Sequence, residues 1–275
     1  MSHFIEVEPG IKVHVEDIGQ GQPVVFVHAW PLNSRIFEQQ AVILAQNGFR
    51  FIGIDLRGYG KSDKPWSGYD FNRMAHDIKA VIDFLQLKNI ILAGYSIGGP
   101  ITIRYLNLFG EEGVEKLLLM AAAAPSYTKR KNFKYGKNRS EVDLLISHIT
   151  QDRPRQMALY AKMYFNKRKS SEFLAWFQSL GLQAGAHSMI HSMIALRDDD
   201  VLGELGAVTL PTAIFHGKKD RSCPFDLARE LNKRLSNSVL VPFHASGHGL
   251  YWDEPQKFNK EMMRFFKSSG IKPKN

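Results

Sequence analysis

The stretch that decides the fold reads Asn89-Ile90-Ile91-Leu92-Ala93-Gly94-Tyr95-Ser96-Ile97-Gly98. Its first half is an apolar run typical of a buried strand, and its second half is a G-x-S-x-G motif. Between a strand and a helix, such a motif forms a nucleophile elbow, a tight turn that lifts the serine hydroxyl clear of the sheet. Bulky side chains two residues on either side of Ser96 would clash, so Gly94 and Gly98 supply the room. The sequence therefore predicts Ser96 as a nucleophile.

The residues after the motif, 97–109, have the pattern of a helix whose N-terminus would point at Ser96. The free N–H groups and the dipole of a helix N-terminus favour negative charge nearby. We therefore expect the backbone N–H of Ile97, the residue after the nucleophile, to stabilise an oxyanion.

A serine hydroxyl is a poor nucleophile at neutral pH, so it needs a base, and the base needs an orienting acid. In enzymes built around this elbow, the acid follows the serine and the histidine comes last. Asp220 stands in the turn after the expected buried strand 212–216, where open α/β sheets place their sites. His248 follows in a glycine-flanked loop, 246–249. We predict Ser96, His248 and Asp220 as nucleophile, general base and orienting acid.

Each member of this triad has an ordinary structural alternative. Ser96 could be a turn serine, and Asp220 could be a solvated loop residue or cap the helix that starts near Phe225. Asp226 and Asp253 are rival acids, although the first fits better as a first-turn helix charge and the second lies close to the next helix start. We interpret the other histidines as structural or surface residues: His3, His14, His28, His76, His148, His187, His191, His216 and His244.

Four motifs together resemble those of the α/β-hydrolase superfamily, and the resemblance covers almost all of the chain. They are the elbow, His28-Ala29-Trp30-Pro31, Asp55-Leu56-Arg57-Gly58-Tyr59-Gly60-Lys61-Ser62, and Gly217-Lys218-Lys219-Asp220 with Pro224. The last three are similar to the family's H-G-x-P oxyanion turn, its D-x-R-G-x-G-x-S motif and its G-x-x-D-x-x-x-P loop. The stretch 65–70 is more narrowly similar to the cofactor-free haloperoxidase and aryl-esterase branch. This resemblance implies esterase activity, with a side activity toward peroxide.

The resemblance also implies a second oxyanion donor, the backbone N–H of Trp30. Ala29 stands where the family usually has glycine, and its methyl group could shift the oxyanion turn. We interpret the segment 55–62 as structural, a tight turn after the expected strand 51–54.

The remaining pattern predicts an α/β fold. The segments 4–7 and 12–15 alternate around Pro9-Gly10 as in an antiparallel hairpin. Further strands are expected at 24–27, 51–54, 90–93, 116–120, 212–216 and 239–243, with helices at 36–47, 71–86, 97–109, 225–235 and 255–267. Continuous apolar strands with helices between them indicate a mostly parallel twisted sheet covered on both faces.

Between residues 125 and 206 this alternation stops, and the pattern becomes helical with many large side chains. We expect 125–206 to be a helical cap, or lid, inserted in a hydrolase core formed by 1–124 and 207–275. Caps exclude water and shape substrate pockets. Most of these large side chains should only pack the cap onto the core. The candidate pocket residues are Trp30, Tyr95, Trp176, Met189 and Met193.

The composition is ordinary for a globular protein, with 275 residues, 44% hydrophobic and 23% charged. No apolar run approaches the about 18 residues of a membrane span. The first residues lack the basic start and apolar stretch of a signal peptide. Cys223 is the only cysteine, which excludes an internal disulfide and fits a reducing compartment. We therefore expect a cytoplasmic monomer or homodimer.

The net charge is +9, and segment 129–139 holds six basic residues and no acidic one. This segment could steer an anionic substrate or touch a membrane surface, and the interleaved Phe133 and Tyr135 would also suit nucleic acid. No nucleic-acid-binding motif supports that alternative. We therefore interpret residues 129–139 as a solvated basic segment and expect no nucleic-acid partner. His187 and His191 have metal-ligand spacing, but no third ligand accompanies them, so we expect no metal.

The sequence therefore predicts a serine hydrolase of small carboxylic esters or lactones that works through an acyl-enzyme on Ser96 without a cofactor. The closest alternative enzyme is a perhydrolase of haloperoxidase type, in which peroxide attacks the same acyl-enzyme. Hydrolysis of amide or C–C bonds stays open, because this triad serves all of these reactions. An alternative of another class is a slow-turnover receptor or a non-catalytic protein of the same fold.

Overall fold

The computed structural model describes residues 1–270 of the chain, and within them eight strands form one sheet in the order β1-β2-β4-β3-β5-β6-β7-β8. The strands are β1 (Ser2–Glu8), β2 (Ile11–Gly19), β3 (Gln22–Val27), β4 (Phe49–Ile54), β5 (Ile90–Tyr95), β6 (Val114–Met120), β7 (Thr212–Gly217) and β8 (Ser238–Phe243). β1 and β2 form an antiparallel hairpin, β2 is also antiparallel to β4, and all other neighbours are parallel. The predicted mostly parallel sheet with an N-terminal hairpin is confirmed.

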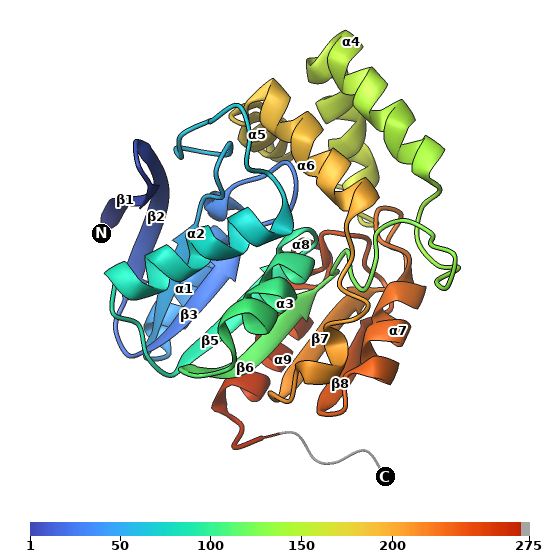
Figure 1. Cartoon of the computed structure of the whole chain (residues 1–275). Coiled ribbons are helices and arrows are strands. Elements are labelled where there is room, and N and C mark those ends of the chain that lie inside the picture. Colours follow the sequence, from blue (N-terminus) through green and yellow to red (C-terminus); the bar gives the residue numbers. More distant parts are fainter. Residues whose placement is uncertain (271–275) are drawn as a thin grey trace.

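Helices cover both faces of this sheet. They are α1 (Glu38–Gln46), α2 (Phe71–Phe84), α3 (Gly98–Phe109), α7 (Phe225–Arg234) and α9 (Pro255–Lys267), with the short turns η1 (Ser34–Phe37), η2 (Leu205–Ala207) and α8 (Leu250–Asp253). α2 and α3 lie on one face, while α1 and α9 lie on the other (Figure 1). The apolar residues of α9 recur at helical spacing and form one buried stripe: Phe258, Met262, Phe265 and Phe266.

The segment between β6 and β7 is helical, and its helices lie together beyond one end of the sheet (Figure 1). They are α4 (Arg139–Tyr164), α5 (Ser171–Leu182) and α6 (Ala186–Asp198). α4 consists of two helices joined at a kink, where Asp152 has non-helical dihedral angles. Its side chain accepts a hydrogen bond from the backbone N–H of Arg155 and so caps the second half, with Pro154 in the first turn. The predicted division into a cap, 125–206, and a core stays a prediction, and residues 271–275 of that core lie outside the described residues.

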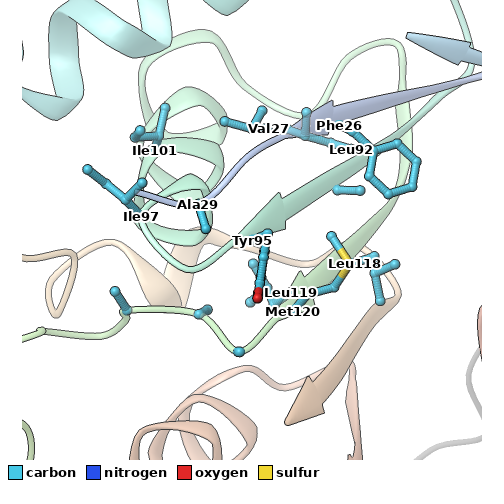
Figure 2. Packing of buried hydrophobic residues seen from close by; sticks show 14 of the residues in the cluster. Phe26, Val27, Ala29, Leu92, Tyr95, Ile97, Ile101, Leu118, Leu119 and Met120 are labelled. Carbon is cyan, nitrogen blue, oxygen red and sulfur yellow. The ribbon is translucent and has the colours of Figure 1, made fainter. Parts of the chain in front are cut away.

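The central strands are buried on both faces, which explains their continuous apolar sequence. Phe26 of β3, Leu92 of β5 and Leu118 of β6 are each fully buried. Figure 2 shows the chain from the end of β3 running past the helix that carries Ile97 and Ile101. This packing holds the elbow and the loop after β3 against each other.

Buried charges fasten the segment 55–62 to the hairpin side of the sheet. The Arg57 guanidinium donates to both carboxylate oxygens of Asp77, at 2.5 and 2.7 Å, and to Glu8 at 2.8 Å. Asp55 accepts a hydrogen bond from His14 Nδ1 at 3.1 Å. A buried pair of this kind is costly to break, because one charge is left without its partner. These contacts give the segment the structural role that its sequence indicates.

Candidate active site

Ser96 lies in the turn between β5 and α3 in the left-handed region, with φ +53°. For a residue other than glycine, such a conformation costs about 1–3 kcal/mol. A Cβ atom at Gly94 would stand 2.5 Å from the carbonyl oxygen of Gly98 and 2.6 Å from Thr102 Oγ1. A Cβ atom at Gly98 would overlap the carbonyl oxygen of Val27, at the end of β3. Glycine is therefore required at both positions for the close approach that the motif predicts.

His248 and Asp220 are buried and joined by a hydrogen bond of 2.7 Å between His248 Nδ1 and Asp220 Oδ2. The other carboxylate oxygen, Oδ1, accepts the backbone N–H groups of Ser222 and Cys223 at 2.8 and 2.9 Å. A carboxylate can only accept, so Nδ1 carries the proton and Nε2 is left as an acceptor. Within residues 1–270, His248 Nε2 is buried and has no hydrogen-bond partner. This nitrogen is therefore available to take a proton.

A second histidine, His216, helps to keep the Asp220 carboxylate ionised. Burial alone would raise the pKa of Asp220, but the adjacent imidazoles of His248 and His216 bring it below its ordinary value. His216 Nε2 donates to the carbonyl oxygen of Cys223 at 2.8 Å and lies 3.4 Å from Asp220 Oδ2. Asp220 thus stays ionised and can hold the imidazole of His248 in one orientation. No pattern in the sequence indicates this role of His216, because its ring reaches Asp220 only through the conformation of the turn after β7.

Aromatic rings enclose the imidazole of His248. The Tyr95 ring stacks on it with centroids 5.3 Å apart, and its hydroxyl donates to the carbonyl oxygen of His248 at 3.0 Å. The Tyr164 ring meets the same imidazole edge-on at 4.8 Å. Tyr95 is fully buried beneath His248, so it supports the histidine, and its predicted contact with a substrate stays a prediction.

The two expected oxyanion donors have free N–H groups. Among residues 1–270, no acceptor takes a hydrogen bond from the backbone N–H of Trp30 or of Ile97. The Trp30 side chain is held by its own bond, from Nε1 to the carbonyl oxygen of Met189 at 3.1 Å. The Tyr160 hydroxyl lies 3.5 Å from the carbonyl oxygen of Trp30. Residues of α4 and α6 thereby fix the turn, while the backbone N–H of Trp30 stays unpaired.

Ala29 fits this turn without a left-handed backbone. The described residues other than glycine that have positive φ are Gln86, Asn89, Ser96 and Ala121. His28 steadies the turn, because Nδ1 donates to the carbonyl oxygen of Ala29 and Nε2 accepts the backbone N–H of Leu56, both at 3.0 Å. Burial lowers the pKa of His28, which keeps this imidazole neutral. The alanine methyl group therefore leaves the turn in an ordinary conformation.

Asp253 fixes the loop that carries His248. Its carboxylate accepts the backbone N–H of Gly247 at 2.8 Å and those of Asn166 and Lys167 at 2.8 and 3.1 Å. The Lys169 ammonium lies 3.1 Å from the same buried carboxylate. Asp253, which the sequence offered only as a rival acid, thus ties the end of α4 to the histidine loop.

A cavity of about 190 Å³ lies between α4 and the loops that follow β6 and β7. Its wall consists of Tyr127, Lys137, Glu141, Val142, Leu144, Leu145, His148, Gln156, Tyr160, Met163, Arg221 and Ser222. Of the predicted pocket residues, Met189 and Met193 are buried on α6, and half-buried Trp176 packs on Phe173 and Trp252. None of these three belongs to the wall of this cavity.

Comparisons with known proteins place this arrangement in a family. The family model for the alpha/beta hydrolase fold matches residues 22–139. The AB hydrolase superfamily protein YisY from Bacillus subtilis is 49% identical to the chain, over 98% of this chain and 100% of that protein. The chain belongs to the α/β-hydrolase fold family.

Two further relatives indicate which branch of the family this α/β hydrolase resembles. The solved structure of an esterase (EaEST) from Exiguobacterium antarcticum superposes with a TM-score of 0.96 at 45% identity, covering 98% of this chain and 100% of that one. A putative non-heme chloroperoxidase from Synechocystis is 34% identical over 93% of this chain and 95% of its own length. The predicted resemblance to the haloperoxidase and esterase branch is confirmed. Membership in this family also supports the prediction that the protein is an enzyme.

Cys223 of this α/β hydrolase lies beside Ser96 but is held as a thiol. Its side chain is fully buried and contacts Ser96. Burial and the charge of Asp220 raise the pKa of Cys223 well above its ordinary value. Because the thiolate is the nucleophilic form, this cysteine packs against Ser96 and does not compete with it.

His187 and His191 of the same α/β hydrolase stack on aromatic rings. His187 lies on Trp66 with ring centroids 5.3 Å apart, and His191 lies on Tyr69 at 6.0 Å. In the described part of the chain, no three histidine, cysteine or acidic side chains gather as a metal site would require. Across residues 1–270, no helix combines the length and the apolar character that crossing a membrane demands.

Proposed function

We propose that this protein is a serine hydrolase of small carboxylic esters or lactones. The observation that carries the proposal is the pairing of a strained Ser96 with a buried His248 whose Nε2 has no partner and whose Nδ1 is held by ionised Asp220. Tyr95, the residue before Ser96 in the chain, stacks on His248, which supports this pairing. The free N–H groups of Trp30 and Ile97 supply the oxyanion donors.

In this mechanism, Ser96 Oγ attacks the ester carbonyl while His248 Nε2 takes the hydroxyl proton. The Trp30 and Ile97 amides stabilise the tetrahedral oxyanion. The C–O bond to the alcohol breaks, and the proton on His248 passes to the leaving alkoxide. Water then attacks the acyl-enzyme while His248 takes a proton from it, and His248 returns that proton to Ser96 Oγ as the carboxylic acid leaves. These steps use side chains and backbone groups of this chain without a cofactor.

The segment 125–206 acts as a cap in this proposal. α4, α5 and α6 lie at the end of the sheet where β5, β7 and β8 deliver Ser96, Asp220 and His248 (Figure 1). Tyr160 and Tyr164 of α4 touch the oxyanion turn and the base. Such a cap excludes water from the acyl-enzyme and shapes the pocket. The cytoplasmic location and the monomeric or dimeric state stay predictions.

The test is steady-state hydrolysis of p-nitrophenyl esters from acetate to decanoate, with Ser96→Ala as the inactive control. We expect multiple turnovers by the wild type, an optimum at one acyl length, and none by the variant. A single burst of p-nitrophenol per protein molecule would indicate the slow-turnover receptor instead. Equal rates for wild type and variant would contradict Ser96 as nucleophile.

The second candidate is perhydrolysis, which the 34% identity to a putative non-heme chloroperoxidase favours. Hydrogen peroxide would take the place of water in attacking the acyl-enzyme, giving a peracid and free Ser96. Incubation with acetate and hydrogen peroxide tests this, with peracid measured by its oxidation of a halide. Absence of peracid alongside good ester hydrolysis would leave only the esterase.

A further inference from the structure

The cavity beside the proposed site has an excess of positive charge on its wall. Its ionised side chains are Lys137, Arg221 and Glu141, and His148 adds a titratable ring. Two permanent cations thus face one carboxylate. Arg221 is exposed, and within the described residues its guanidinium has no ion-pair or hydrogen-bond partner. A guanidinium in this position can bind a carboxylate through two parallel hydrogen bonds.

Glu141 offsets only one of the two positive charges, so the wall keeps a net positive charge. Oε2 accepts the backbone N–H and the side-chain amide of Asn138 at 2.8 and 2.9 Å, in the capping box that starts α4. The nearest distance from Glu141 Oε1 to the Lys137 ammonium is 3.7 Å, beyond hydrogen-bond range. Lys137 therefore keeps donors for another anion.

The same cavity borders residues that contact the proposed catalytic groups. Its wall residue Ser222 donates its backbone N–H to Asp220, and its wall residue Tyr160 lies against the carbonyl oxygen of Trp30. Through these two residues the cavity adjoins the proposed active site.

Apolar side chains cover the rest of the wall. Val142, Leu145 and Met163 come from α4, and Tyr127 comes from the loop after β6. Such a surface accommodates methylene groups. A ligand that extends from the proposed active site into this cavity would therefore meet both apolar side chains and the two cations of the wall.

We propose that the preferred substrates of this protein are esters that carry a carboxylate on a short apolar chain, with Arg221 and Lys137 binding that carboxylate. The proposal rests on the esterase function above and adds the substrate class. Hemiesters of dicarboxylic acids have this chemistry. Neutral esters of the same length would leave Arg221 without a counter-charge.

The experiment compares two sets of ethyl esters at neutral pH. One set is the monoethyl esters of succinate, glutarate, adipate and suberate, and the other replaces the free carboxylate of each by a carboxamide of nearly the same shape. The readout is the ratio of kcat/KM for carboxylate over carboxamide at each chain length. The variants are Arg221→Gln, Lys137→Gln and the double substitution. The control is Lys131→Gln, which removes an exposed charge of the same basic segment outside the cavity wall.

For the wild type we expect a ratio of about ten or more at the best chain length, the effect of one charge-assisted hydrogen bond. Each single substitution should lower the ratio and the double substitution should bring it close to one, while Lys131→Gln keeps it. High salt should weaken the preference, because exposed charges are screened. A wild-type ratio near or below one at every length, or a ratio that survives the double substitution, overturns the proposal.

p-Nitrophenyl acetate separates this outcome from failure of the esterase function. Turnover of p-nitrophenyl acetate without a preference for the carboxylate refutes the substrate class alone. No turnover of p-nitrophenyl acetate and of either ethyl ester set refutes both proposals.

Discussion

Two of the buried histidine–aspartate pairs within residues 1–270 stand with a serine. In the first, Ser2 Oγ lies 2.6 Å from His14 Nε2, and His14 Nδ1 lies 3.1 Å from Asp55 Oδ2. In the second, His248 Nδ1 bonds Asp220 at 2.7 Å, but Nε2 has no partner within residues 1–270. The group in which serine, histidine and aspartate are all joined by hydrogen bonds, called the first relay below, is thus Ser2–His14–Asp55, which lies outside the proposed active site.

The difference shows that a hydrogen-bonded serine, histidine and aspartate do not make a catalytic site by themselves. Ser2 stands on the extended edge strand β1, whereas Ser96 stands in a left-handed turn at the start of α3. Free N–H groups flank only the second serine in the way an oxyanion requires. In the first relay, Asp55 also accepts the backbone N–H groups of Ser34 and Lys61, at 2.8 and 3.0 Å, so its bonds join segments of the fold.

The largest expected effect separates the two serines. Ser96→Ala should lower kcat for a p-nitrophenyl ester by about 10⁶-fold, as loss of the nucleophile does in other serine hydrolases. Ser2→Ala removes the hydroxyl of the complete relay and should leave kcat within about twofold. A fluorophosphonate probe followed by peptide mass spectrometry should label Ser96 and not Ser2. Labelling of Ser2, or loss of activity in Ser2→Ala, would contradict the conclusion that the first relay has no catalytic role.

The next effect separates the two aspartates. Asp220→Asn should lower kcat by about 10⁴-fold, because the amide no longer holds the reactive tautomer of His248. Asp55→Asn should instead lower the free energy of unfolding by about 2 kcal/mol, since its bonds to His14 and two backbone N–H groups weaken. The measurements are kcat and urea unfolding for both variants. A large loss of kcat in Asp55→Asn at unchanged stability would assign the first pair a catalytic role.

A smaller effect concerns what holds the imidazole. Tyr95→Phe removes the hydroxyl that donates to the carbonyl oxygen of His248 but keeps the stacked ring. The loss of one such bond, about 1 kcal/mol, should lower kcat by about fivefold with KM unchanged. Tyr69→Phe is the matched control, because the Tyr69 hydroxyl donates to the carbonyl oxygen of Pro65 and not to His248. Equal effects of both substitutions on kcat would show that Tyr95 has only a general packing role.

How much of this site the sequence predicts depends on how local each contact is. The elbow is local: the spacing of Gly94 and Gly98 around Ser96 is a steric requirement within five residues, so the sequence reveals it. The mostly parallel sheet follows in the same way, because apolar strands and helical stripes repeat along the chain. The confirmed α/β-hydrolase fold was therefore accessible from residues alone.

The supporting contacts were not accessible in this way. Tyr164 meets His248 from α4, and Asp253 binds backbone groups at the end of that helix. The pair His14–Asp55 joins β2 to the loop after β4. Such contacts depend on how distant elements pack, and no spacing in one sequence encodes them. The packing of Trp176 against Trp252 is another contact of this kind, and the predicted place of Trp176 in a substrate pocket stays a prediction.

The smallest expected effect is a pH dependence that both pairs share. Burial raises the pKa of each aspartate, but the neighbouring imidazoles and N–H donors lower it below the ordinary value, both for Asp55 and for Asp220. The unfolded chain then binds more protons in acid, so each carboxylate contributes stability that is complete above its ordinary pKa, about 3.9, and is lost as the pH falls below it. We call the difference in free energy of unfolding between the wild type and a variant the stability gap. For Asp220→Asn and for Asp55→Asn, this gap should be constant from pH 7 to about 5 and narrow toward pH 3.

Urea unfolding at a series of pH values measures these gaps, with Asp226→Asn as the control, because Asp226 is an exposed helix residue. The stability gaps of Asp220→Asn and Asp55→Asn should change alike with pH, although the kcat values of these two variants differ by orders of magnitude. If the gap for Asp220→Asn stays constant down to pH 3, its carboxylate is not stabilised by His248 and His216 in the ionised form. The proposed orienting role of Asp220 would then lose its electrostatic basis, whereas the structural role of Asp55 would stand.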